Sequence, residues 1–512
     1  MEGPFPRHHH PMVQVIVDNR IRVKCSDLPA EVIIALKKAF DHWNPMRAKL
    51  EAMGVRGYAL HKEPRFISSW LLEGDEFSIP RGGIGRLRDV FEEFGIPRQV
   101  IDNRTEGTGP RGIPTHTVTL RTFQQDIVDR IIEVQNCVIR SPTGSGKTTA
   151  ALSVASVVDL PTLVIVWTGG LLDQWVRRAE SELGICGDDI GIIGSGKRRV
   201  RPLTIGMQQS LAKCAVELAD TFGMVIADET QKSSASTFFN VIDKFRAKYR
   251  IGFSADEHRK DKKEFLIYDL FGDVAVDVSQ DSLIDGGYVH DVEVRVVPTD
   301  FDAEWYKPLF EESFGDRHIP QALYEARLRA FDRLTNEMML DKARGELAVQ
   351  IATDEIRDGH QVVLLSHRRE WCQRLDADLS AKGIKCGQML GGTESKVEYD
   401  RTLHSLLDGS LRAAAGTYQA IGQGIDIPSV SVGICCSPLA NSADGKPFWS
   451  QVRGRLCRTS AGKQGARLYY LLDSRVYDEK PLKNLMRWNK RVVVREGAAW
   501  IEAKEWMKAR NS

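Results

Sequence analysis

Residues 136–158, NCVIRSPTGSGKTTAALSVASVV, carry the feature that most constrains the fold of this chain. A short apolar strand runs into a Gly-rich turn, and a helix of small and apolar residues follows. In that order the backbone N–H groups of the turn point at a phosphate, helped by the helix N-terminus. We expect Lys147 to reach the β- and γ-phosphates of ATP and the Thr148 hydroxyl to bind Mg²⁺. The predicted nucleotide-binding residues of this loop are Thr143, Gly144, Ser145, Gly146, Lys147, Thr148 and Thr149.

A second apolar strand, MVIA at 224–227, ends in two adjacent carboxylates, Asp228 and Glu229. Parallel strands of one sheet end at the same edge, so these acids are expected beside the phosphate loop. Asp228 is predicted to hold Mg²⁺ through water, and Glu229 to orient or deprotonate the attacking water. Phosphoryl transfer needs charge neutralisation and an aligned nucleophile, and two acids at a strand end supply both.

The length and composition bound the remaining possibilities. The 512 residues exceed one core and predict three domains or four, and the 42% hydrophobic fraction is typical of globular proteins. We find no run of 18 apolar residues and no apolar signal-peptide core, so we expect no membrane span and a cytoplasmic location. The nine cysteines include no CxxC pair, which favours reduced thiols over a disulfide framework or a zinc site.

The net charge of +1 does not by itself indicate nucleic-acid binding. Local basic patches do exist at 197–201 (KRRVR), at 259–263 (RKDKK) and in the Arg/Lys-rich tail after Pro481. Each patch is a candidate contact for nucleic acid, and the alternative for each is a solvated surface.

Strands alternate with helices from 136 to 254 and again from 359 to 472, which predicts two parallel α/β sheets. The second series has no phosphate loop. It does carry Gln451, Arg453, Arg455 and Arg458 on one predicted helix, where Arg455 and Arg458 would share a face. We predict that these two act as arginine fingers on a γ-phosphate, with a solvated basic helix as the alternative.

Over residues 116–480 the chain resembles the superfamily 2 helicases. Seven segments follow the order of that family's motifs: SPTGSGKT, VIVWTGGLLDQW, DETQ, FSAD, VVLLSH, GTYQAIGQGIDIP and QVRGRLCR. The segment LRTFQQDIVDRI, at 120–131, resembles the family's adenine-reading segment. The resemblance implies two tandem RecA-like domains that use ATP and Mg²⁺ and bind DNA.

Matching positions imply roles for further residues. Gln124 would read adenine with help from Arg121, and Gly424 and Asp426 would touch the nucleotide from the second domain. Gln451 joins Arg455 and Arg458 in the predicted catalytic set. The implied contacts with nucleic-acid phosphates, which position a strand without reading its sequence, are Thr168, Gln208, Ser366 and Thr417.

The sequence departs from the family pattern at several positions. Ser141 replaces the first Gly of the phosphate loop, and Gln231 replaces a usual His. Asp256 and Glu257 stand where the family has Thr and Pro. An extra carboxylate near Asp228 is unfavourable unless it is paired or points away. We predict that Gln231 and Asp256 relay between the ATP and DNA sites, and the alternative is that both are tolerated surface variants.

The motif style is closest to the XPB/UvsW-like group of DNA helicases, and the layout of residues 12–103 resembles the small α+β N-terminal domain of that group. Trp43, Trp70 and Arg81 are candidate DNA contacts in it, with a core role as the alternative for the two tryptophans. A Gly/Pro-rich linker is predicted at 103–115, followed by a self-contained motor. The predicted domains are an N-terminal domain, a first RecA-like domain, a helical connector, a second RecA-like domain and a helical tail, at 1–112, 113–298, 299–345, 346–480 and 481–512.

The predicted function is that of an ATP-dependent DNA helicase or translocase. It would act on single-stranded, duplex or branched DNA in replication, recombination or repair, with proteins of those processes as partners. The expected setting is a bacterial cytoplasm or that of a phage-infected host. Two alternatives stay open, an RNA helicase and the motor subunit of a restriction or phage-defence complex.

Overall fold

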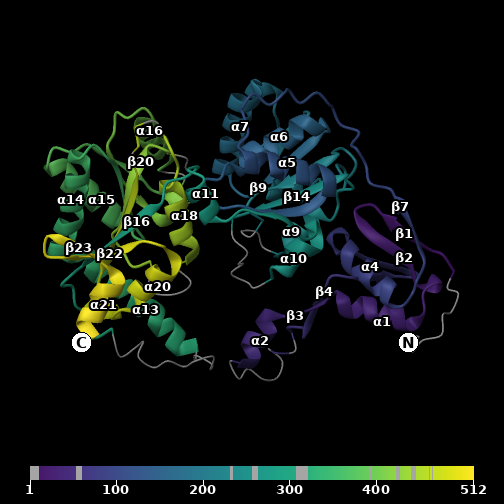
Figure 1. The fold of residues 1–512 in the computed structure, drawn as a ribbon, viewed down its shortest axis with the longest axis horizontal. Helices are drawn as coiled ribbons and strands as arrows, with labels where there is room; N and C mark the ends of the chain where they lie inside the picture. The colour runs from purple at the N-terminus through teal and green to yellow at the C-terminus, as the bar shows by residue number, and fades with distance from the viewer. Residues whose placement is uncertain are drawn as a thin grey trace. The chain divides into compact units, whose positions relative to one another are not determined.

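A computed structural model describes residues 11–52, 60, 62–230, 235–255, 263–306, 321–392, 395–422, 427–439, 446–460, 462–463 and 465–511. The chain forms two compact units. Unit 1 contains residues 1–142 and 146–279, and unit 2 contains residues 280–512 with residues 143–145 of the phosphate loop. Figure 1 shows unit 1 in purple to teal and unit 2 in teal to yellow.

Unit 1 begins with a small α+β body, as predicted. Its five-stranded sheet has the order β5 (Leu71–Glu73), β6 (Glu76–Pro80), β2 (Arg20–Lys24), β1 (Val13–Val17), β7 (Arg98–Asp102). Helices α1 (Ala30–Ala39) and α4 (Ile84–Glu93) bury Leu36 and Phe91 against it. The alternating burial of β1, with Val13 and Val15 inside, is the period-2 pattern of a strand with one buried face.

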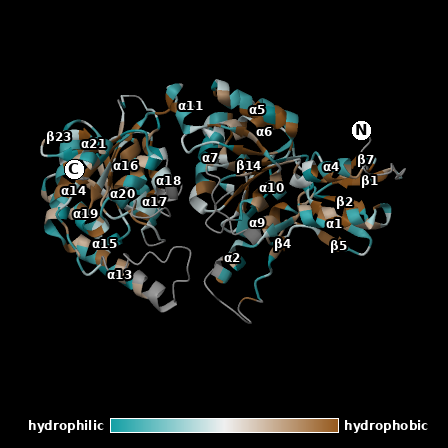
Figure 2. Cartoon of the chain, turned by 60° about the horizontal axis from the view of Figure 1, so that its bottom comes forward, coloured by the Kyte–Doolittle hydropathy of each residue, from teal (hydrophilic) through white to brown (hydrophobic). Residues whose placement is uncertain are grey.

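The large sheet of unit 1 is parallel except at its edge strand β11. Its order is β11 (Lys197–Arg199), β10 (Gly191–Gly194), β12 (Leu203–Met207), β9 (Thr162–Val166), β13 (Met224–Ala227), β14 (Tyr249–Ser254), β8 (Asn136–Arg140), β15 (Val274–Asp277). Its helices are α5 (Thr122–Val134), α6 (Lys147–Val158), α7 (Gly169–Leu183), α8 (Gln208–Leu211), α9 (Ala235–Ile242) and α10 (Phe265–Phe271). Strands β9, β13 and β14 are buried along their whole length, as expected for a parallel sheet covered on both faces. Brown, hydrophobic residues accordingly line its strands in Figure 2.

Buried charges join the small sheet to the large sheet inside unit 1. Arg20 pairs with Asp243 at 2.7 Å, with both side chains almost fully buried. Arg81 is 2% exposed and donates to Asn136 Oδ1 at 2.8 and 2.6 Å and to the Ala247 carbonyl at 2.5 Å. Arg81 therefore fastens the two sheets together, and its guanidinium is buried in this joint instead of open to DNA as predicted.

The predicted linker at 103–115 is wrong for its first half, which lies against the large sheet. Thr105 N donates to the Arg246 carbonyl at 2.9 Å, and Lys248 N donates to the Thr105 carbonyl at 2.8 Å. Thr108 N donates to the Asp220 carbonyl at 2.9 Å. A Cβ at Gly107 would lie 2.5 Å from Gly223 N, so only glycine permits this approach. Residues 103–109 are thus an integral part of unit 1.

Unit 2 is built on a second eight-stranded sheet, parallel except for β22–β23. Its order is β18 (Cys386–Met389), β19 (Ala413–Thr417), β17 (Gln361–Ser366), β20 (Val430–Cys435), β21 (Ala466–Leu472), β16 (Val292–Pro298), β22 (Val492–Glu496), β23 (Ala499–Glu502). Its helices are α11 (Gln280–Asp285), α13 (Gln321–Leu340), α14 (Lys342–Arg357), α15 (Arg369–Ala381), α16 (Lys396–Leu407), α17 (Tyr418–Gly422), α18 (Lys446–Leu456), α19 (Ser474–Tyr477), α20 (Lys480–Trp488) and α21 (Ala503–Asn511).

Two predicted boundaries need correction. Strand β16 lies inside the range predicted for the first RecA-like domain, yet it pairs with β21 over its whole length and belongs to the second sheet. The tail predicted as helical at 481–512 contains the hairpin β22–β23, and β22 extends the second sheet by pairing with β16. The predicted fold class, two tandem parallel sheets with a small α+β domain, is confirmed. Among the described residues no helix is long and apolar enough to span a bilayer.

The joint in unit 1 predicts a contrast between two neighbouring glycines. A Cβ at Gly82 would lie 2.2 Å from the Tyr268 carbonyl oxygen on α10, whereas a Cβ at Gly85 meets nothing within 4 Å. Gly82→Ala is expected to lower the free energy of unfolding by about 1–3 kcal/mol because backbone must move apart. The matched control Gly85→Ala is expected to leave it within about 0.5 kcal/mol. Urea unfolding measures both, and equal stabilities of the two variants would contradict the joint.

Candidate nucleotide and nucleic-acid site

The phosphate loop connects β8 to α6, as the sequence predicts. Gly144 and Gly146 have φ of 92° and 85°, a conformation that favours glycine. A Cβ at Gly146 would lie 2.4 Å from Gln124 Nε2, so this position has a second reason to be glycine. Lys147 is the first residue of α6, and its Nζ donates to the Ser141 and Pro142 carbonyls at 3.0 and 3.3 Å. The lysine is thereby folded over the loop that it is predicted to serve.

Gln124 ties the start of α5 to this loop. Its Oε1 accepts from Arg121 N at 3.0 Å, and its Nε2 donates to the Gly146 carbonyl oxygen at 3.4 Å. The side chain is almost fully buried. The family-derived pair Arg121 and Gln124 therefore sits next to the phosphate loop, while adenine recognition by them stays a prediction.

The two predicted acids follow β13, two strands away from β8. Asp228 is 7% exposed, and its Oδ2 accepts from the indole Nε1 of Trp175 on α7 at 2.9 Å. Its carbonyl oxygen accepts from the Trp167 indole at 2.6 Å. Glu229 adopts φ 52°, the left-handed conformation that a non-glycine residue takes only when its surroundings impose it. The Trp175 indole thus orients the Asp228 carboxylate, and the Trp167 indole holds the backbone of the same residue.

A buried polar cluster behind the loop was not predicted. The Thr149 hydroxyl accepts from Arg178 Nη2 at 2.8 Å and donates to Glu182 Oε1 at 3.3 Å. Glu182 also pairs with Arg178 at 2.6 Å and with His116 Nε2 at 3.0 Å. Its side chain is 4% exposed. The Thr149 side chain is thus engaged in fastening α6 to α7. The available signal was a glutamate on the apolar face of α7, seven residues after Trp175.

The predicted phosphate contacts of unit 1 lie at two helix starts. Thr168 caps α7, with its Oγ1 accepting from Leu171 N at 3.3 Å. Gln208 begins α8, is 7% exposed, and has a buried Nε2 with no hydrogen-bond partner among the described residues. Buried amide groups normally have hydrogen-bond partners, so the side chain of Gln208 is a candidate contact for a ligand.

In unit 2 the two corresponding hydroxyls accept from backbone N–H groups that follow strand ends. Ser366 is fully buried, and its Oγ accepts from Arg368 N at 3.0 Å at the start of α15. Thr417 Oγ1 accepts from Ala420 N at 3.3 Å at the start of α17. His367, next to Ser366, donates from its Nε2 to the Pro438 carbonyl oxygen at 3.0 Å, and burial lowers the pKa of His367. Because the Ser366 side chain is fully buried, it supports the site from inside the fold. A contact between this position and a nucleic-acid phosphate, made through the backbone, stays a prediction.

The arginine-rich element differs from its prediction in one respect. Helix α18 ends at Leu456, so Arg458 lies two residues beyond it and does not share a helical face with Arg455. Gln451 and Arg455 lie on α18 and are partly buried. Arg453 is a structural residue, because its Nη1 donates to the Trp488 carbonyl at 2.8 Å. The predicted site residues outside the described residues are Gly424 and Asp426, with the motif departures Gln231, Asp256 and Glu257.

Residues 117–257 match the family model of the type III restriction enzyme res subunit. The probable helicase D10 of Escherichia phage T5 is 26% identical over 380 residues, which are 73% of this chain and 75% of that protein. The DNA 3'-5' translocase XPB2 of Sulfurisphaera tokodaii is 28% identical over 210 residues, 41% of this chain and 47% of that protein. Two further viral relatives are named as RNA helicases.

The chain is similar in sequence to proteins named as helicases. The predicted resemblance is confirmed, and the names of the relatives agree with the predicted enzyme class, an ATP-dependent DNA helicase. The alignment spans three quarters of the phage relative but about half of the archaeal one.

Solved structures add the fold alone. A fragment of an HsdR-type subunit of a type I restriction enzyme from Vibrio vulnificus matches with a TM-score of 0.52 at 16% identity, over 74% of this chain and 69% of that one. The structure of T4 UvsW covers 95% of this chain at 13% identity, with a TM-score of 0.42 that is too low to support an argument.

The Trp175–Asp228 hydrogen bond predicts a change in metal dependence. Trp175→Phe keeps most of the buried volume but removes the indole donor, which leaves the Asp228 carboxylate less well oriented. The Mg²⁺ concentration for half-maximal ATP hydrolysis is expected to rise about tenfold. Trp371→Phe, at an equally buried tryptophan of unit 2, is the control and should leave that concentration unchanged. Identical Mg²⁺ titrations of the two variants would contradict the role of Trp175.

Proposed function

We propose that the protein hydrolyses ATP and uses the cycle to move along DNA or separate its strands. The observation that carries the proposal is the edge of the large sheet in unit 1. There a phosphate loop with Lys147 follows β8, and a buried, indole-held Asp228 follows β13. Helicase names among the relatives support the same reaction class.

The residues of unit 1 suit a nucleotide with Mg²⁺. Mg²⁺ prefers oxygen ligands, and the Thr148 hydroxyl and Asp228 carboxylate are the groups that would hold it. Bound Mg²⁺ neutralises charge on the β- and γ-phosphates. Lys147 Nζ would leave the Ser141 and Pro142 carbonyls for those phosphates, and Glu229 would orient the attacking water. From unit 2, Arg455 and Arg458 would stabilise the charge that develops during transfer, with Gln451 beside them on α18.

DNA is the proposed substrate, in single-stranded, duplex or branched form, and recombination, replication and repair proteins are the proposed partners. Thr168, Gln208, Ser366 and Thr417 lie at helix starts that follow strand ends, where backbone N–H groups can bind phosphates. The second candidate is RNA, because two viral relatives carry RNA-helicase names. The third candidate is a role as the motor subunit of a restriction complex, because residues 117–257 match the family model of a restriction enzyme subunit.

Removing the loop cation tests the proposal. Lys147→Ala is expected to abolish ATP hydrolysis without loss of folding, since no other group of the loop supplies its charge. The wild type is assayed with single-stranded DNA, duplex DNA, forks, four-way junctions and RNA. Stimulation by DNA but not RNA supports the proposal; stimulation by RNA alone favours the second candidate. Turnover that survives in Lys147→Ala would refute the assignment of the ATP site.

The arginine fingers have a test of their own. Arg455→Ala and Arg458→Ala are each expected to lower the turnover number by about 10²-fold or more with little change in ATP affinity, because fingers act on transition-state charge. Arg475→Ala is the control, at an arginine of α19 whose side chain is 56% exposed. Weaker ATP binding at an unchanged turnover number would show that the residue in question is no finger.

A further inference from the structure

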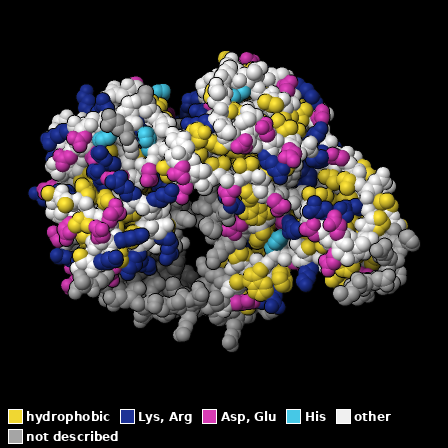
Figure 3. Space-filling view, in the orientation of Figure 1, with side chains coloured by type: hydrophobic (Ala, Val, Ile, Leu, Met, Phe, Trp, Pro, Cys, Tyr) yellow, Lys and Arg dark blue, Asp and Glu magenta, His cyan; other side chains and the backbone are white. Residues whose placement is uncertain are grey.

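A pair of aromatic rings stands exposed on the ribbon formed by β3 (Asp41–Trp43) and β4 (Phe66–Ser68) in unit 1. Trp43 and Phe66 are cross-strand partners with ring centroids 5.5 Å apart, and each is 44% exposed. The Arg65 guanidinium lies 5.1 Å from the Trp43 ring centroid and 5.9 Å from that of Phe66. Hydrophobic side chains gather over this part of the surface in Figure 3. Exposed rings in a cluster indicate a surface that something covers.

The ribbon holds these rings in a fixed place. A two-stranded ribbon is marginal by itself, but this one is fastened at its base. The Asp41 carboxylate accepts from Ser68 Oγ at 2.5 Å and from the Trp70 indole at 2.8 Å. Asn44, 1% exposed, donates to the Pro64 carbonyl at 2.9 Å and accepts from Met46 N at 3.0 Å. A platform held in this way loses little conformational freedom when a ligand binds.

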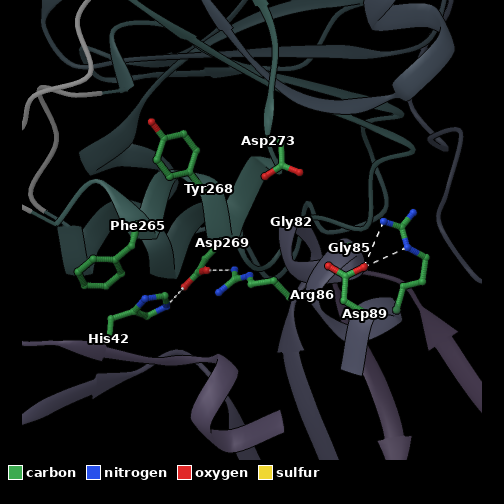
Figure 4. A pocket seen from close by; sticks show the side chains of 10 residues that line it. His42, Gly82, Gly85, Arg86, Asp89, Phe265, Tyr268, Asp269 and Asp273 are labelled. Atoms are coloured by element: carbon green, nitrogen blue, oxygen red, sulfur yellow. Dashed lines mark hydrogen bonds and ion pairs between the residues drawn. The ribbon is translucent and has the colours of Figure 1, made fainter. Parts of the chain in front are cut away.

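His42, the residue before Trp43, attaches the ribbon to helix α10 of the large sheet. His42 Nε2 lies 2.9 Å from Asp269 Oδ2 on α10, and its ring stacks on Phe265 at 4.1 Å. Arg86 pairs with the other oxygen of Asp269. Burial acts to raise the pKa of Asp269, but the hydrogen bonds from His42 and Arg86 outweigh it and the pKa is lowered. These groups line a pocket of about 400 Å³ between the small sheet and α10, where Figure 4 shows His42 and Arg86 converging on Asp269.

The other two DNA-contact candidates of the small domain, Trp70 and Arg81, are engaged in contacts within unit 1. Trp70 stacks on Phe77 at 5.8 Å and spends its indole N–H on Asp41, and Arg81 is buried in the joint. Of the three, Trp43 alone presents an open ring face. Arg65, the residue before β4, brings positive charge to that ring at 5.1 Å, while the Glu63 carboxylate accepts from Asn44 at 3.2 Å.

We propose that Trp43 and Phe66 form a stacking platform for the bases of an unpaired DNA strand, with Arg65 beside the adjoining phosphates. The inference rests on the proposed function and adds to it a base-contacting site outside the two large sheets. Every nucleobase has a face that stacks on an aromatic ring, so the platform would be indifferent to sequence. Two rings under a guanidinium fit a base and its phosphate better than an uncharged apolar partner.

The test couples changes in the protein to changes in the DNA. Binding of a labelled single strand of about 20 nucleotides is expected to weaken roughly tenfold in Trp43→Ala. Abasic residues are then placed in successive windows of the strand. In one window the abasic residues should weaken wild-type binding by the same factor as Trp43→Ala does. In that window they should not weaken the binding of Trp43→Ala any further. Trp43→Phe should retain most of the affinity, and Ile34→Ala, at an exposed apolar residue of α1, should retain all of it.

Several outcomes would overturn the platform. Wild-type affinity in Trp43→Ala at an unchanged unfolding temperature would do so, as would a uniform loss with no window of coupling. If the abasic window and Trp43→Ala were coupled only in RNA, the rings would bind RNA instead of DNA. If Trp43→Ala changed the oligomeric state in sedimentation, the rings would form a contact between copies of the chain. DNA-stimulated ATP hydrolysis by the wild type separates the two ideas. If it is present and Trp43→Ala binds normally, the platform alone is wrong, whereas if it is absent the proposed function falls and the platform with it.

Discussion

A cluster of buried guanidinium groups holds unit 1 together. Arg20 and Arg81 reach from the small sheet into the large one, and Arg250 of β14 reaches back, with Nη2 donating to the Asn19 carbonyl at 3.1 Å. Burial lowers the pKa of Arg250 to about 10 and raises that of Asp243, as expected when charges leave water. Each of the three guanidinium groups has partners in the joint, so separating the two sheets would take those partners away from buried charge. The small sheet is therefore a structural part of the first motor domain.

Most of the fold followed from periodicity, and the exceptions have physical reasons. Buried strands such as β9 and β13 are short apolar runs between turn signals, which is why both parallel sheets were predicted. Residues 103–109 looked like a linker because glycine and threonine are typical of loops. Their actual role depends on Gly107 passing within contact of Gly223, which no local pattern reveals. Strand β16 was misplaced for a similar reason, since its pairing with β21 joins residues far apart in sequence.

The candidate site was predictable where chemistry is concentrated at strand ends. Lys147 and Asp228 were found because a glycine-rich turn and a pair of acids are rare at such positions. The residues that hold them were not found, because a tryptophan on a helix reads as core. Trp175 does fill the core, yet its indole N–H is aimed at Asp228. Glu182 was missed as well, since surface and buried glutamates look alike until the fold brings His116 and Arg178 to them.

Trp43 and Trp70 show the limit of sequence reasoning most directly. Both are tryptophans of the same small domain, and for each the sequence left two roles open, a DNA contact or a place in the core. Their fates differ because of what lies next to them: Trp70 follows the end of β4 and turns onto Phe77, while Trp43 is the partner of Phe66 at the open side of the ribbon. The adjacent His42 faces the opposite way, toward Asp269 of α10. Since side chains alternate along a strand, fastening His42 to the motor domain is what directs Trp43 outward. One inward hydrogen bond thus accounts for the exposure of the neighbouring ring.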